Sequence, residues 1–123
     1  MPVKVVDASA VGALLFGEPD GPQIAARLRE SRLVAPALLY FEVASICVKK
    51  LKRHPDQHAA LLEGLRFLGR LAIERLEVDV SGVVHLAETS KLTAYDASYL
   101  WLAEQLDAEL VTLDHTLNTA MKL

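Results

Sequence analysis

The stretch VKVVDASAVGALLF, residues 3–16, decides the fold of this chain. Its first four residues, 3–6, form a short run rich in β-branched side chains, which predicts a strand that ends at Asp7. Residues 8–16 are apolar apart from one serine and are long enough for a short helix. A strand that passes directly into a helix begins a βαβ unit, so Asp7 is expected at the end of a strand.

The rest of the chain repeats this alternation. Further strands are predicted at residues 33–35, 75–80 and 110–113. Helices are predicted over six segments, of which the second follows Pro36 and the third opens at Pro55: 24–30, 37–52, 55–71, 81–91, 93–106 and 116–122. The pattern predicts an α/β fold, a three-layer α/β/α domain with a short central parallel sheet that occupies residues 1–123. Ligands of such sheets bind at the carboxyl ends of the strands.

Composition narrows the class of protein. The 123 residues carry a formal net charge of −3, and 52% of them are hydrophobic, which predicts that a second chain covers part of the surface. No apolar run reaches the roughly 18 residues of a membrane helix, and no signal peptide is recognisable. The single cysteine, Cys47, excludes an intramolecular disulfide. These features predict a cytoplasmic protein without a membrane partner.

Four acidic residues are isolated from all other charges. Asp7, Glu42, Asp96 and Asp114 are the only formally charged residues in windows 5–17, 37–48, 92–103 and 110–121, respectively. Carboxylates in apolar segments are candidates for partial burial, which is costly unless something compensates their charge. No lysine or arginine lies beside them in these windows to do so.

Three of the four also have a capping interpretation. Asp7 and Asp114 can each cap the helix that follows, and Thr93 to Asp96 resembles a capping box. Glu42 lies inside an apolar helix between Phe41 and Val43, where no cap is needed. If the fold gathers the four carboxylates, a divalent cation would offset their repulsion. Hard oxygen ligands suit Mg²⁺ or Mn²⁺ better than zinc.

A basic cluster follows Glu42 at the end of the same predicted helix. It consists of Lys49, Lys50, Lys52 and Arg53. Such a run is typical of a solvated helix end, and it also suits contacts with the phosphates of a nucleic acid. Both interpretations stay open at the level of sequence.

The four acids are also the places where the sequence resembles a known family. The segments VVDASA (5–10), YFEV (40–43), LTAYDA (92–97) and LVTLD (110–114) look like the motifs of the PIN-domain ribonucleases, in order and over nearly the whole chain. Length and motifs are most similar to the VapC toxins of toxin–antitoxin pairs. Members of the family commonly continue into a fifth strand, whereas this sequence ends at Leu123, so a shorter sheet edge or a truncated chain is expected.

The resemblance implies a Mg²⁺- or Mn²⁺-dependent endoribonuclease that forms a homodimer and is silenced by a cognate antitoxin. Carried over by position, the metal ligands would be Asp7, Glu42, Asp96 and, in part through water, Asp114. Ser9 and Thr112 would support these ligands by hydrogen bonding. The basic cluster would contact the RNA substrate.

Two other classes compete with this interpretation. A catalytically silent PIN-like module that binds RNA or protein would keep the fold without the chemistry. An aspartyl-phosphate phosphotransferase of the haloacid dehalogenase type would use an aspartate after the first strand, but it generally needs a second aspartate two residues later. Ser9 occupies that position here.

Overall fold

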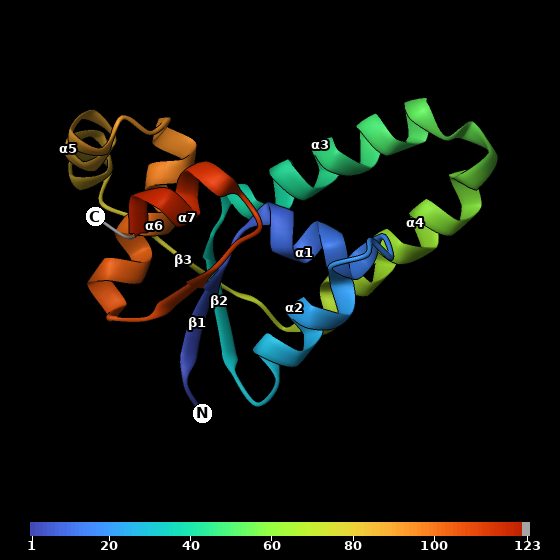
Figure 1. Cartoon of the computed structure of the whole chain (residues 1–123), viewed down its shortest axis with the longest axis horizontal. Helices are drawn as coiled ribbons and strands as arrows, with labels where there is room; N and C mark the ends of the chain where they lie inside the picture. Colours follow the sequence, from blue (N-terminus) through green and yellow to red (C-terminus); the bar gives the residue numbers. More distant parts are fainter. Residues whose placement is uncertain (122–123) are drawn as a thin grey trace.

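Four short parallel strands form the centre of the computed structural model, which describes residues 1–121 (Figure 1). The strands lie in the order β3-β2-β1-β4 and comprise β1 (Val3–Val6), β2 (Arg32–Pro36), β3 (Glu74–Leu76) and β4 (Glu109–Val111). Val5 lies opposite Val34 on one side and Leu110 on the other. Val5 and Val6 are both fully buried although they face opposite sides of the sheet. The sheet is therefore covered on both faces, as parallel sheets require.

Helices cover the two faces of the sheet. Figure 1 shows one layer on the right, made of α1 (Ala8–Leu15), α2 (Gly21–Leu28), α3 (Leu38–Arg53) and α4 (His58–Arg66). The other layer, on the left, consists of α5 (Val80–Ser90), α6 (Ala94–Leu106) and α7 (His115–Met121). The predicted three-layer α/β/α architecture is confirmed. No helix within residues 1–121 is both long enough and apolar enough to cross a membrane.

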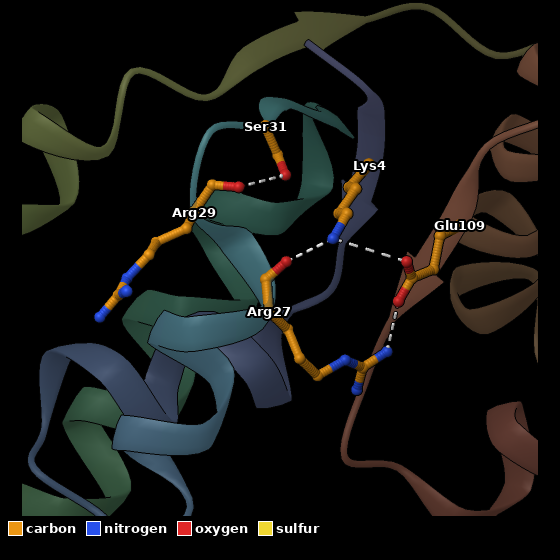
Figure 2. Close-up of polar contacts among 5 residues, drawn as sticks. All are labelled: Lys4, Arg27, Arg29, Ser31 and Glu109. Atoms are coloured by element: carbon orange, nitrogen blue, oxygen red, sulfur yellow. Dashed lines mark hydrogen bonds and ion pairs between the residues drawn. The ribbon is translucent and has the colours of Figure 1, made fainter.

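A charged cluster ties α2 to the amino-terminal halves of two strands (Figure 2). The Lys4 ammonium donates a hydrogen bond to the carbonyl oxygen of Arg27 and lies 3.6 Å from Glu109 Oε2. Arg27 Nη2 donates to Glu109 Oε1 at 2.7 Å. Ser31 closes the adjoining turn by donating to the Arg29 carbonyl oxygen at 3.1 Å. These contacts fix α2 at the edge of the sheet opposite to the strand ends that carry Asp7 and Asp114.

Several predicted boundaries differ from the structure. Pro36 ends β2, where it lies opposite Leu76, and does not open the next helix. The predicted helix 55–71 is divided into a 3₁₀ turn (Pro55–Gln57), α4 and a second 3₁₀ helix (Phe67–Leu71). The strand predicted at 75–80 is only Glu74–Leu76, because the Asp79 side chain accepts a hydrogen bond from Gly82 N and caps α5. Asp79 therefore caps the helix that was predicted to begin at residue 81.

The strand order indicates where a binding site is expected. The chain moves from β1 to β2 to β3 in one direction, and β4 then returns to the other side of β1. The order thus reverses between β1 and β4, and loops at the carboxyl ends of two such strands diverge and leave a crevice. Asp7 follows β1 directly, and Asp114 lies three residues after the end of β4. Both acids lie at this reversal point.

Candidate active site

Asp7 is held by a network that joins the ends of β1 and β4. Its Oδ1 accepts hydrogen bonds from Ala10 N at 3.0 Å and from Ser9 Oγ at 2.8 Å, and its Oδ2 accepts one from Thr112 Oγ1. Asp7 is only 4% exposed. It therefore caps α1, as one interpretation of the sequence predicted, and it is also the buried centre of a polar cluster.

Ser9 and Thr112 connect the Asp7 side chain to the segment that carries Asp114. Ser9 Oγ accepts a hydrogen bond from Leu113 N at 2.9 Å, and Thr112 Oγ1 accepts one from Asp114 N, also at 2.9 Å. The two hydroxyl groups lie 3.3 Å apart. Each hydroxyl thus donates to the Asp7 carboxylate and accepts from the backbone after β4, so the two chain segments cannot shift independently.

Asp114 caps the last helix. Its Oδ1 accepts a hydrogen bond from Leu117 N at 2.9 Å at the start of α7. Within residues 1–121 its other oxygen, Oδ2, has no hydrogen-bond partner. The capping interpretation of Asp114 is therefore correct, and it still leaves one carboxylate oxygen available for a ligand.

Glu42 approaches the same region from α3. It is half-buried, and its Oε1 accepts a hydrogen bond from the Tyr99 hydroxyl on α6 at 2.6 Å. Tyr99 is 1% exposed, and burial together with the Glu42 carboxylate raises the pKa of its hydroxyl, which therefore stays protonated. Sequence analysis did not identify the bond between Tyr99 and Glu42. The available signal was the position of Tyr99 three residues after Asp96 on one helix face.

Asp96 lies in the first turn of α6. Thr93 caps this helix by accepting a hydrogen bond from Asp96 N at 3.1 Å. The reciprocal bond that would complete a capping box, from Thr93 N to the Asp96 side chain, is not formed, so the box resemblance is only half correct. Within the described residues the half-buried Asp96 carboxylate has no hydrogen-bond partner.

The four carboxylates lie close enough to repel one another. Burial raises the pKa of Asp7, hydrogen bonds from Thr112, Ala10 and Ser9 lower it in part, and repulsion by Asp114 raises it further. Burial likewise raises the pKa of Glu42, the Tyr99 hydrogen bond opposes this rise, and Asp96 and Asp7 add repulsion. For Asp96, burial and repulsion by Asp114 and Asp7 act in the same direction. The fold thus gathers four acids that the sequence spaces over more than 100 residues.

Among residues 1–121, no basic side chain forms an ion pair with any of the four carboxylates. The ion pairs within residues 1–121 join other acids to Lys4, Arg27, Arg32, Lys50 and Arg66. Each of the four carboxylates keeps acceptor capacity that these residues do not use. The donor set therefore suits a hard divalent cation. As placed, no three His, Cys, Asp or Glu side chains among the described residues lie close enough to hold one ion, so the carboxylates would have to move closer to bind it.

A cleft of about 400 Å³ leads away from Ser9 along α1 and α3. Among its lining residues are Lys49, Lys50 and Arg53, whereas Lys52 of the same cluster does not line it. Lys50 lies 2.6 Å from Glu18 and 6.0 Å from the centre of the Phe16 ring, so its charge is partly compensated. The structure therefore divides the basic cluster into members that face the cleft and one that does not.

The sheet order and the four acids near the strand-order reversal agree with the family that the comparisons identify. A PIN domain model matches residues 4–122, and the chain belongs to the PIN domain family. It is 32% identical over 118 residues to "Ribonuclease VapC3" of Pyrobaculum aerophilum, covering 92% of this chain and 90% of that one. It is 38% identical over 111 residues to "Ribonuclease VapC9" of Mycobacterium tuberculosis, covering 89% and 84%.

A solved structure gives the same result for the fold. The crystal structure of PAE2754 from Pyrobaculum aerophilum superimposes with a TM-score of 0.77 at 27% sequence identity. The match covers 97% of this chain and 84% of that one. The similarity therefore extends over the sheet and both helical layers.

Proposed function

We propose that this protein is a metal-dependent endoribonuclease and the toxin component of a type II toxin–antitoxin pair. The observation that carries the proposal is the group of four carboxylates at the strand-order reversal, none of which has a basic partner among the described residues. The similarity to proteins named VapC ribonucleases supports the same activity. Asp7, Glu42, Asp96 and Asp114 would hold Mg²⁺ or Mn²⁺.

The chain's own residues would orient Asp7 before substrate binds. When bound, a divalent cation activates water for attack on a phosphodiester and stabilises the charge that develops on the phosphoryl oxygens. Ser9 and Thr112 would hold the Asp7 carboxylate in one orientation, because each donates to it and accepts from the backbone after β4. Outer hydrogen bonds of this kind fix ligand geometry.

The cleft beside Ser9 would hold the RNA backbone. Lys49 and Arg53 line it without an ion-pair partner among the described residues, and they would contact phosphates next to the one that is cleaved. Lys50 would contribute less because Glu18 shares its charge. Such contacts are electrostatic and independent of sequence, so affinity would fall as salt rises.

The partners would be RNA, a cognate antitoxin protein and a second copy of this chain. Exposed apolar side chains support the homodimer, with Phe41 79%, Val80 71% and Val84 58% exposed. Exposed apolar side chains commonly mark protein–protein contacts where they form a contiguous patch. A cytoplasmic location fits a chain whose single cysteine, Cys47, is free and buried.

The main competing function is a catalytically silent PIN-like module that binds RNA or protein. It would need the fold and the cleft but not the carboxylates. Because all four acids are present and approach one another, the nuclease is favoured. A covalent phosphate on Asp7, as in a phosphotransferase, is disfavoured because such enzymes generally need a second aspartate two residues later, and Ser9 occupies that position.

The proposal is tested by incubating antitoxin-free protein with a pool of structured RNAs, in Mn²⁺ or in EDTA, beside the Glu42→Gln and Glu63→Gln variants. Glu42→Gln keeps an oxygen that can accept from Tyr99 but removes the charge, so cleavage should fall at least about 100-fold, the upper end of the loss seen when a residue that only supports a metal ligand is removed. Glu63 is exposed on α4, and its variant should cleave like the wild type. Cleavage in EDTA, or equal cleavage by Glu42→Gln, would contradict the metal site. A wild type that binds RNA but never cleaves it would favour the silent module.

A further inference from the structure

The Tyr99 hydroxyl occupies a position that packing alone does not explain. Tyr99 is among the largest fully buried side chains of the protein, within a core of otherwise apolar residues such as Leu102 and Leu39. A phenylalanine would fill nearly the same volume without a polar group that needs a partner. A buried hydroxyl is costly unless it is hydrogen-bonded, so its partner indicates what it does.

That partner is Glu42. The distance of 2.6 Å from the Tyr99 hydroxyl to Glu42 Oε1 is typical of a hydrogen bond to an ionised carboxylate. Among the described residues Tyr99 is the only hydrogen-bond donor to this carboxylate, whereas Asp7 has three donors. A glutamate has three rotatable side-chain bonds, and ordering a long side chain costs conformational entropy. The Tyr99 bond is thus the contact that restricts where the Glu42 carboxylate lies.

The placement of Tyr99 along α6 links two of the four acids. Asp96 and Tyr99 are three residues apart and so lie on one face of that helix. Asp96 comes from α6 itself, and Glu42 comes from α3 across the bond to Tyr99. One helix therefore supplies one carboxylate directly and restrains a second one.

We propose that Tyr99 is a positioning residue that restrains the Glu42 carboxylate near the site, so that a smaller rearrangement is needed when the metal binds. Its hydroxyl occupies Oε1 and leaves Oε2 without a hydrogen bond among the described residues, so a cation would find a ligand that is already ordered. This inference rests on the proposed metal site. It adds a residue outside the four acids whose loss lowers metal affinity without removing a ligand.

The test is a titration of the intact chain with Mn²⁺, followed by electron paramagnetic resonance, for the wild type and for Tyr99→Phe. The Kd for Mn²⁺ should rise about 10–100-fold, the usual effect of removing a hydrogen-bond partner of a metal ligand. Tyr40→Phe is the matched control, because Tyr40 also donates its hydroxyl across the protein, to the Ile73 carbonyl oxygen at 3.2 Å. Its Kd should stay within about twofold of the wild-type value, inside the spread expected for a site with no shared partner.

A second comparison separates positioning from a general effect on the fold. If Tyr99 acts through Glu42, Tyr99→Phe should not weaken Mn²⁺ binding further in a Glu42→Ala background. Independently of any variant, side-chain scalar couplings of Glu42 in the metal-free wild type should report one rotamer. Averaged couplings would overturn the proposal even if Tyr99→Phe failed to fold.

The possible failures are distinguishable. If Tyr99→Phe binds Mn²⁺ as tightly as the wild type does, the role of Tyr99 is overturned and the proposed function stays intact. An equal loss of affinity in Tyr40→Phe, or a further loss in the Glu42→Ala background, would do the same. A wild type that binds no Mn²⁺ would overturn the proposed metal site and this inference with it.

Discussion

At the scale of single residues, Glu42 shows how the candidate site opposes the stability of the fold. Burial raises the pKa of its carboxyl group, the Tyr99 hydrogen bond lowers it in part, and repulsion by Asp96 and Asp7 raises it further. An acid whose pKa rises on folding binds protons more tightly in the folded state. The contribution of Glu42 to the free energy of unfolding is therefore highest at pH values below the ordinary pKa of glutamate. It falls as pH rises toward the pKa of the folded state and stays lower at pH 7.

Glu42→Gln should for this reason stabilise the metal-free protein while it impairs function. In EDTA at pH 7 the melting temperature should exceed that of the wild type by about 2–5 °C, and the difference should shrink as pH is lowered below the ordinary pKa of glutamate. Adding Mn²⁺ should raise the melting temperature of the wild type more than that of the variant, because a ligand stabilises only the state that binds it. Differential scanning calorimetry measures both effects.

The exposed residue Glu63 provides the control for this stability effect. Glu63 pairs with Arg66 at 3.3 Å on the surface of α4, and exposed pairs of this kind contribute little to stability. Glu63→Gln should therefore leave the melting temperature nearly unchanged at both pH values. A Glu42→Gln variant that melts below the wild type in EDTA would show that its charge is compensated, contrary to the repulsion argued above.

At the scale of elements, the contact of α4 with the end of α1 allows no side chain at Gly64. A Cβ atom at this position would lie 2.3 Å from the Leu15 carbonyl oxygen, a backbone atom that cannot move without displacing α1. Replacing glycine by alanine inside an exposed helix usually stabilises by about 1 kcal/mol. Gly64→Ala should instead lower the free energy of unfolding by about 1–3 kcal/mol, measured by urea denaturation, because overpacking forces the backbone apart.

Gly69→Ala is the matched comparison for Gly64→Ala. Gly69 lies in the neighbouring 3₁₀ helix, and a Cβ atom there would meet nothing within 4 Å. Its replacement should leave stability unchanged or raise it by up to about 1 kcal/mol, since alanine restricts the unfolded chain. Equal effects of the two substitutions would mean that α4 does not pack on α1 as described.

A second prediction at this scale concerns the basic residues at the carboxyl-terminal end of α3 and their effect on RNA binding. Charge reversal of Lys49 and Arg53, which line the cleft, should weaken RNA binding at least about tenfold at low salt. It should also reduce the salt dependence by about 0.7 per lost phosphate contact. Lys52→Glu makes the same change of charge at a residue that does not line the cleft, and it should therefore have a smaller effect on RNA binding. Binding is measured by fluorescence anisotropy in the Glu42→Gln background, so that RNA stays intact, and equal effects of the variants would exclude the cleft as the binding surface.

The elements also show how far sequence reasoning reached. The strand at Val3–Val6 and the helix after Thr93 were predictable, because a buried β-branched run and a capping threonine are local signals. The break of the helix predicted at 55–71 was not, because its apolar periodicity continues through the 3₁₀ segment. The strand predicted at 75–80 failed because the alternation of Val78 and Val80 competes with the Asp79 cap, whose geometry a pattern does not reveal.

Some features of the candidate site could likewise be predicted from the sequence, and others could not. The four acids stood out in the sequence because each is isolated in an apolar window; in the structure they lie near enough to influence one another's pKa, although no three of them are placed to hold one ion. The bond from Tyr99 to Glu42 spans 57 residues, and the pair of Lys50 and Glu18 joins two different elements. Pairings of this kind depend on how the elements pack, so the spacing of Asp96 and Tyr99 could indicate a shared helix face but neither pairing itself.

At the scale of the whole molecule, the exposed apolar side chains bear on assembly. Phe41 on α3 is 79% exposed, and Val80 and Val84 on α5 are 71% and 58% exposed, whereas Phe67 is 45% exposed and is partly covered by Arg70, 4.9 Å above its ring. If Phe41, Val80 and Val84 form the homodimer contact, their burial stabilises the dimer by roughly 25 cal/mol per Å² of apolar surface that is removed from water.

The double variant Phe41→Glu/Val84→Glu should therefore raise the dimer dissociation constant at least about tenfold, because a charge placed in a buried contact without a partner is costly. Sedimentation velocity over a range of concentrations measures this constant. Phe67→Glu, on the surface formed by α4 and the following 3₁₀ helix, introduces a charge at another exposed aromatic and should leave the constant unchanged. If Phe67→Glu dissociates the dimer and the double variant does not, the contact lies on the α4 side. If the wild type sediments as a monomer at all concentrations, these apolar side chains have another partner, and the antitoxin is then the first candidate to test.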